Sequence, residues 1–203
     1  MRKTIFIFLS LETIISCREK TDRLPNKENQ GLTEVQAALN DSIHAPFSFM
    51  KVPMEALPVH ENTNFRNFDE AYRKKHHPAR IYTKLTDEQV EKLGLQKWLE
   101  SGKNVTVNYQ LSYPGNFKTF VFTYQEKERK LNTMMVTFDK NYKKLDELLV
   151  AYDGSSESTT TTTSSISHTN IVVKNFYRST RGSEITNTSY LIRETGNIEI
   201  RKK

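Results

Sequence analysis

The chain has 203 residues, a length that suits one domain or one domain with tails. Hydrophobic residues make up 36% and charged residues 27%, and the chain contains 11 Phe, 9 Tyr and 1 Trp. This supply of aromatic side chains excludes a wholly disordered chain, a collagen and a membrane protein with many spans. A single cysteine excludes an intrachain disulfide framework.

The N-terminus has the pattern of a secretory signal. Arg2 and Lys3 give a basic start, residues 4–11 are mostly apolar, and the small residue Ser16 precedes Cys17. The apolar stretch is far shorter than the ~20 residues that a membrane-spanning helix needs. We therefore predict that residues 1–16 are a cleaved signal peptide.

The sequence Ile14-Ile15-Ser16-Cys17 resembles the lipobox of bacterial lipoprotein precursors, in which an apolar pair and a small residue precede a cysteine. The resemblance implies that Cys17 is lipidated, carries palmitate or a similar chain, and becomes the first residue of the mature protein. It also implies a place in the cell envelope, at the outer rather than the inner membrane. The alternative is that Cys17 is an ordinary small buried residue.

The rest of the chain is predicted to form a tether and one domain. Residues 17–31 are polar, include Pro25 and have no apolar period, which is typical of a flexible tether. Residues 32–203 are expected to form a single globular domain with a helical part over 32–102 and a β part over 104–201. The fold class is therefore α+β, mostly β.

Four helical segments are expected in the first part. The third has signals at both ends, because Thr86 and Gln89 are spaced as a capping box and Gly94 stands where a Schellman turn needs a positive φ. The four are a helix from Thr33 that ends before Pro46, and helices over Asn67–His76, Asp87–Leu93 and Gln96–Glu100.

From Asn104 onward the apolar residues alternate with polar ones, which indicates half-buried strands. About eight short antiparallel strands are expected, in a meander that forms a curved sheet or a small barrel. The connections are too short for parallel crossovers. The strands are predicted over 104–113, Phe117–Gln125, Leu131–Phe138, Lys144–Tyr152, 155–169, Ile171–Ser179, Glu184–Arg193 and Asn197–Arg201.

Residues 155–169 contain 12 Ser or Thr residues among 15, which fits either a polar strand or a disordered linker. Because threonine favours strands and the run lacks Gly and Pro, we favour the strand. With little apolar surface it should lie at a sheet edge, where a partner strand could add, or bend away from the packed face. Thr160 and Thr162 are then expected to be little buried.

The sequence offers no recognisable catalytic, metal or cofactor site. Asp139 begins a run that looks like a calcium loop, but Lys143 stands where an oxygen ligand belongs. Asp146 and Glu147 are neighbours on a predicted strand and should point to opposite faces, so they are not an acid–base pair. The five histidines, none of them in a metal-ligand spacing, are His44, His60, His76, His77 and His168.

The basic residues are scattered, which argues against nucleic acid as a partner. Residues 85–89, 136–141 and 190–192 loosely resemble small uncharacterised lipoproteins of Gram-negative bacteria, a group that implies no reaction.

Three hypotheses follow for the function. The first is a lipid-anchored, non-enzymatic binding module whose partner is a protein or a glycan. The second is a carrier of a small apolar ligand in a curved-sheet cavity. The third is a hydrolase whose site forms from distant residues. The residues that would line the carrier's cavity are Phe120, Phe122, Tyr124 and Tyr152.

Overall fold

The computed structural model describes residues 48, 51–76, 82–126, 130–154 and 159–202. The chain divides into two units between Ile43 and His44, and all of these residues belong to the second unit. The predicted signal peptide, Cys17, the tether and the helix at Thr33 lie outside the described residues, so they stay predictions.

Two short helices replace the single one predicted over Asn67–His76. These are α2 (Phe65–Phe68) and α3 (Glu70–His76). Asp69 separates them because its backbone is extended there, with ψ at 129°. Its side chain accepts a hydrogen bond from the Tyr72 N–H (2.9 Å), in the manner of an N-cap, and so starts the second helix.

The helix α4 (Asp87–Lys92) confirms the predicted signals at both ends. The Thr86 N–H donates to Gln89 Oε1 (2.9 Å), and the Gln89 N–H donates to Thr86 Oγ1 (3.3 Å), which completes the capping box. Gly94 has a φ of +68°, and its N–H donates to the Glu91 carbonyl (2.9 Å). The Leu95 N–H reaches the Val90 carbonyl (3.1 Å), so both hydrogen bonds of a Schellman turn are present.

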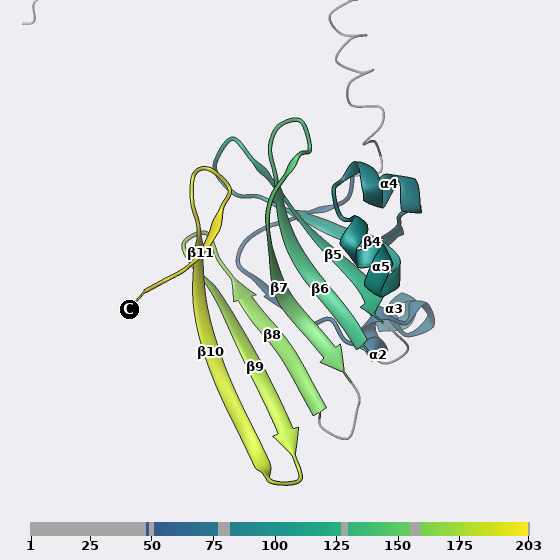
Figure 1. Cartoon of the computed structure of the whole chain (residues 1–203), viewed down its shortest axis with the longest axis vertical. Helices are drawn as coiled ribbons and strands as arrows, with labels where there is room; N and C mark the ends of the chain where they lie inside the picture. Colours follow the sequence, from purple (N-terminus) through teal and green to yellow (C-terminus); the bar gives the residue numbers. More distant parts are fainter. Residues whose placement is uncertain (1–47, 49–50, 77–81, 127–129, 155–158, 203) are drawn as a thin grey trace, which may run out of the picture. The chain divides into compact units, whose positions relative to one another are not determined.

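The strands form one mixed, open sheet with the order β1-β4-β5-β6-β7-β8-β9-β10-β11, in which β2 also pairs with β8 and β3 with β4 (Figure 1). The antiparallel meander from β4 to β11 is confirmed. Of the two predicted arrangements, the curved sheet fits and the closed barrel does not. The strands of the meander are β4 (Gly102–Leu111), β5 (Lys118–Glu126), β6 (Lys130–Phe138), β7 (Lys144–Gly154), β8 (Thr159–Ile166), β9 (Ile171–Ser179), β10 (Gly182–Ile192) and β11 (Ile198–Ile200).

Three short strands lie in the part that was predicted to be helical, and the prediction missed them. They are β1 (Met54–Glu55), β2 (Val59–Glu61) and β3 (Thr83–Lys84). The pairing of β1 with β4 is parallel, so the expectation of an antiparallel sheet is wrong at this pair. Segments of two or three residues have no readable period, and the partner strand rather than their own sequence fixes them.

The Thr-rich segment forms the strand β8, but its predicted place at an edge is wrong. The strand pairs with β9 along its whole length, and on its other side with β7 and then with β2. Thr162 is 3% exposed, and its hydroxyl donates to Asn175 Oδ1 (2.8 Å). A polar strand can stand inside a sheet when its hydroxyls find such partners, because the cost of burial is then offset.

Two hydrophobic clusters pack on opposite faces of β4, β5 and β6. Along β5, Phe120 and Phe122 belong to one cluster and Val121 to the other, as the alternation of side chains requires. The helices α4 and α5 (Gln96–Ser101) cover the first face with Val90 and Trp98 (Figure 1). The second face is covered by residues of β2, β8 and β9, so the bent sheet packs against itself.

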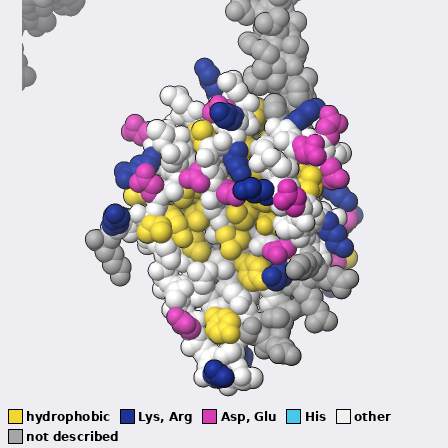
Figure 2. Space-filling view, viewed as in Figure 1, with side chains coloured by type: hydrophobic (Ala, Val, Ile, Leu, Met, Phe, Trp, Pro, Cys, Tyr) yellow, Lys and Arg dark blue, Asp and Glu magenta, His cyan; other side chains and the backbone are white. Residues whose placement is uncertain are grey.

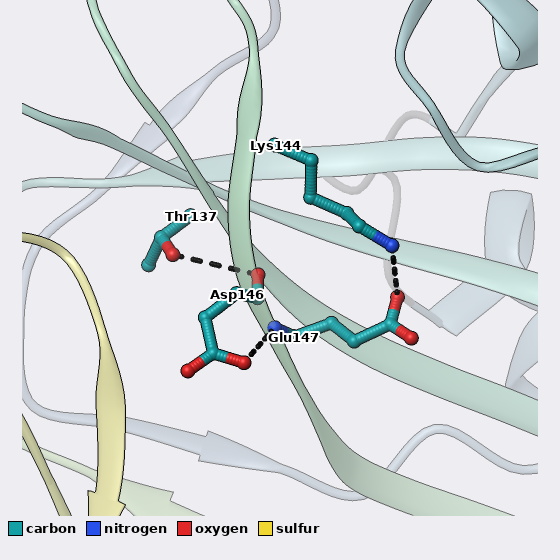
Figure 3. A network of polar contacts seen from close by, with 4 residues as sticks. All are labelled: Thr137, Lys144, Asp146 and Glu147. Carbon is teal, nitrogen blue, oxygen red and sulfur yellow. Dashed lines mark hydrogen bonds and ion pairs between the residues drawn. The ribbon is translucent and has the colours of Figure 1, made fainter.

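A set of polar contacts fixes the end of the sheet at the β10–β11 turn. Thr137 Oγ1 donates to the Gly196 carbonyl (2.7 Å), and the Ile198 N–H donates to Asp146 Oδ2 (2.8 Å). Figure 3 shows the neighbouring contacts, in which Asp146 Oδ1 accepts the Glu147 N–H (2.8 Å) and the Glu147 carboxylate pairs with Lys144. The β10–β11 turn is therefore held against β6 and β7, and the opposite end of β10 extends away from these contacts.

Candidate binding surface

The strands β9 and β10 form a hairpin, called the ribbon below, whose tip lies beyond the ends of β7 and β8 in Figure 1. Their pairing runs without a register shift from Gly182 opposite Ser179 to Tyr190 opposite Ile171. On the inner side of the ribbon, β8 pairs with β9 from Thr159 opposite Arg178 to Ile166 opposite Ile171. Residues 182–187 of β10 are all exposed. In the face that Figure 2 shows, most of the surface at this end of the molecule is white, which stands for the backbone and for side chains that are neither hydrophobic nor charged.

One side of β10 is an open sheet edge. Within the described part of the chain, β11 pairs with β10 only from Tyr190 to Ile192, and no strand pairs with the outer side of residues 182–188. The Arg201 N–H donates to the Ser189 carbonyl (2.8 Å), so the backbone groups of Ser189 point outward. In an antiparallel strand this direction repeats every second residue. The N–H and C=O groups of Ser183, Ile185 and Asn187 therefore point to the open edge.

The same three residues share one face of the ribbon with their partners on β9. Ser183 stands opposite Arg178, Ile185 opposite Phe176, and Asn187 opposite Lys174. Phe176 is partly buried, and Ile185 is 53% exposed, so the middle row of this face is apolar. The two flanking rows each combine a cation on β9 with a small polar residue on β10.

This face continues into an open groove of about 380 Å³ between β2, β8, β9 and β10. The groove is lined mainly by hydroxyl, amide and basic side chains, with Val172 as its apolar contribution. Its lining residues are His60, Glu61, Asn62, Thr163, Ser164, Ser165, Val172, Lys174 and Asn187.

The buried carboxylate of Glu61 fixes β2 at the rim of the groove. Its Oε1 accepts the N–H groups of Asn62 and Thr63 (both 2.9 Å) and the Thr63 hydroxyl (2.5 Å), while its Oε2 accepts the Tyr109 hydroxyl (2.5 Å). Glu61 is 0% exposed, and Tyr109 comes from β4, far along the chain. We therefore assign Glu61 a structural role that places His60 and Asn62 at the surface.

The cations of the ribbon are available to a partner. Lys174 and Arg178 are exposed, and within the described residues neither forms an ion pair. On β9 and β10 the rows of this face at Ser183, Ile185, Asn187 and Ser189 contain no carboxylate. Farther across the sheet, the row of Ile185 reaches Asp153 of β7, whose Oδ2 accepts the Phe65 N–H (2.9 Å). An anion that approaches the β9–β10 part of this face therefore meets no carboxylate in the rows that these two strands form.

The turn between β8 and β9 is held by the partly buried Tyr113. The Tyr113 hydroxyl donates to the Ser167 carbonyl (2.8 Å), and the ring lies edge-on to His168 at 6.4 Å. Burial raises the pKa of the Tyr113 hydroxyl well above its ordinary value, because the phenolate would lose its hydration.

The aromatic residues proposed to line a cavity are instead packed in the core or partly buried. Phe120 and Phe122 are 1% and 0% exposed, and Trp98 stacks on Tyr124 at 5.1 Å between ring centroids. Tyr152 is partly buried, and its side chain lies close to Gly154 of the same strand. This packing gives the carrier hypothesis no support.

The other residues considered for chemistry are apart from one another. His60 lies on the groove, His76 stacks on Tyr72 (4.3 Å) and His168 lies beside Tyr113. His44 and His77 are outside the described residues.

The acidic residues considered for chemistry make local contacts. Asp139 Oδ1 accepts the N–H groups of Asn141 (2.8 Å) and Lys143 (2.9 Å), so this carboxylate closes a turn. Asp146 and Glu147 direct their carboxylates to different partners, as predicted (Figure 3). Among the described residues no group of three His, Cys, Asp or Glu side chains is placed to hold a metal ion.

The sequence pattern predicted the open edge at residues 155–169, whereas the structure has it at β10. The sequence of β10 does contain an indication of an open edge. Its segment Gly182–Thr188 has a single charged residue, Glu184, and lacks the Lys and Pro residues that commonly protect sheet edges against pairing.

Comparison with protein-family profiles, with curated proteins and with solved structures finds no match to this chain. No helix in the described part is both long and apolar enough to cross a membrane.

Proposed function

We propose that this protein is a lipid-anchored, non-enzymatic binding module of the bacterial cell envelope that captures a protein partner at the open edge of β10. The observation that carries the proposal is the row of outward backbone groups at Ser183, Ile185 and Asn187. Unpaired N–H and C=O groups at a regular strand spacing bind an added strand without any change in the sheet.

The anchor part of the proposal rests on the lipobox that ends at Cys17. Two or more acyl chains hold a protein on a membrane stably, whereas a single chain does so only marginally. The polar tether over residues 17–31 would then give the domain reach from the membrane surface. We place the anchor in the outer membrane in preference to the inner one.

The experiment combines fatty-acid labelling with cross-linking in intact bacteria. The full chain should incorporate a clickable fatty acid, and the Cys17→Ser variant should not. Equal labelling of both would refute the anchor.

For the edge, a photoreactive amino acid replaces Ile185 in one variant and Lys97, an exposed residue of α5, in a control. We expect a discrete protein adduct from position 185 alone, and we expect Asn187→Pro to remove it. Adducts of equal yield from both positions, or none from position 185, would refute binding at the edge.

A further inference from the structure

The chemistry of the partner can be read from the face that adjoins the open edge. We propose that β10 binds an extended, acidic peptide segment as an added strand, with the pattern acidic–any–apolar–any–acidic. This inference rests on the proposed function, because it specifies the partner of the same edge. It rests on the order of three residue pairs along one face of the ribbon. Arg178 stands opposite Ser183, then Phe176 opposite Ile185, and then Lys174 opposite Asn187.

The backbone of the ribbon sets the register of the added strand. Each of Ser183, Ile185 and Asn187 presents one N–H and one C=O at the edge, so an added strand can pair with three alternate residues of β10. In such pairing, residues of the partner that stand opposite these three point their side chains to the same face.

The side chains on this face determine which side chains fit at the opposite positions of the partner strand. A partner residue opposite Ile185 would extend the row formed by Ile185 and Phe176, and an apolar side chain there covers the exposed part of Ile185. The flanking positions stand opposite Ser183 and Asn187, whose side chains are short.

Short side chains on β10 leave room for partner carboxylates to reach the cations of β9. The partner strand and β9 lie two strand spacings apart, about 10 Å between Cα atoms. A lysine or arginine and a glutamate together can span this distance. Arg178 and Lys174 therefore fit acidic side chains two positions on either side of the apolar residue.

The charge of this face favours an acidic partner over a second copy of the chain. Lys174 and Arg178 form no internal ion pair in the described part, so no existing contact has to break. A second copy paired at the same edge would bring its own cations to this face with no carboxylate opposite them. Because the acidic pattern is symmetric about its apolar centre, it holds for a parallel and for an antiparallel added strand.

The test measures fluorescence anisotropy with the full-length lipidated protein in detergent. The probe is a labelled Thr-Thr-Glu-Thr-Val-Thr-Glu-Thr-Thr peptide. One control peptide has Lys in place of both Glu residues, and another has the same composition with one Glu moved by one position, so that its two acids point to opposite faces. We expect the probe to bind at least about tenfold more tightly than either control. The Lys peptide loses both ion pairs, and the shifted peptide has one of its two acids on the wrong face.

Two variants of the protein separate the backbone contribution from the charge contribution. Asn187→Pro removes one outward N–H and should weaken probe binding, whereas Asn187→Ala keeps that donor and should bind like the native chain. The double variant Lys174→Glu with Arg178→Glu should lose the acidic probe and gain the Lys peptide. Both cations are exposed, so circular dichroism should show an unchanged fold.

Several results would overturn the inference. These are no probe binding up to about 1 mM, equal binding of the probe and the Lys peptide, or binding that Asn187→Pro leaves unchanged. Concentration-dependent self-association in sedimentation velocity that Asn187→Pro abolishes would make a second copy the occupant. A specific cross-link from position 185 in cells together with a failed probe would overturn the acidic pattern and leave the proposed function standing.

Discussion

The buried Glu61 carboxylate provides the sharpest test of how the groove is held in place. Glu61→Ala removes the acceptor of hydrogen bonds from the hydroxyls of Thr63 and Tyr109, both of which are 2% exposed. A buried donor that loses its acceptor costs roughly 1–3 kcal/mol. For the two hydroxyls together we expect a loss of about 4 kcal/mol in the free energy of unfolding. This is a large share of the ~5–15 kcal/mol that holds a typical domain together.

Two further variants divide this loss among its causes. Glu61→Gln keeps the size and one acceptor oxygen, but it places an NH₂ donor near the Tyr109 hydroxyl, so we expect an intermediate loss of about 2 kcal/mol. Tyr109→Phe removes one donor and should cost about 1–2 kcal/mol. Because Glu61 and Tyr109 are in contact, the double variant should cost less than the sum of the single variants.

Urea unfolding followed by tryptophan fluorescence measures these differences, since the single Trp98 lies in the core. A loss below about 1 kcal/mol for Glu61→Ala would refute the assignment of this carboxylate as the buried tie between β2 and β4. Strict additivity of Glu61→Ala and Tyr109→Phe would show that the two side chains do not interact as the structure has them.

Three other changes test separate parts of the fold. Gly94→Ala should lower stability in urea unfolding by about 1 kcal/mol through its positive φ, since a Cβ there meets only Lys144 at 4.0 Å. Gly94→Asn should cost less, and equal costs would contradict this reason. Thr162→Ala should cost about 1 kcal/mol through its lost hydrogen bond, whereas Thr160→Ala should be neutral within ~0.5 kcal/mol; similar costs in the same assay would contradict the burial of Thr162. Because the pKa of Tyr113 is raised on folding, its contribution is complete below pH 10 and is lost as the pH rises beyond it. The melting temperature should therefore fall less steeply above pH 10 in Tyr113→Phe than in the native chain, and identical slopes would contradict the assignment.

The sequence predicted most of the local structure because the relevant signals act over a few residues. The capping box at Thr86 and the positive φ of Gly94 depend on neighbours within one or two turns, and both are present. The alternation from Asn104 onward reflects which side chains face a core, so it located the strands of the meander to within a few residues.

The place of β8 in the sheet depended on contacts that no local pattern contains. Its threonine-rich composition predicted an edge, because the burial of hydroxyls was counted as a cost. The structure offsets that cost with a partner from the neighbouring strand, Asn175 for Thr162, and with backbone pairing on both sides. The short strand β2 supplies part of that pairing, and three residues are too few to be read as a strand in advance.

The sequence by itself determined the caps of α4 and the series of strands from β4 onward, because each of these depends on residues close along the chain. Only the tertiary structure decided which strand keeps an open edge. That choice depends on where β11 stops pairing with β10 and on the long-range contacts that hold the β10–β11 turn, Thr137 with Gly196 and Asp146 with Ile198. The same register brings Lys174, Ile185 and Arg178 to one face, since pairing between strands rather than order along the chain sets which side chains are neighbours.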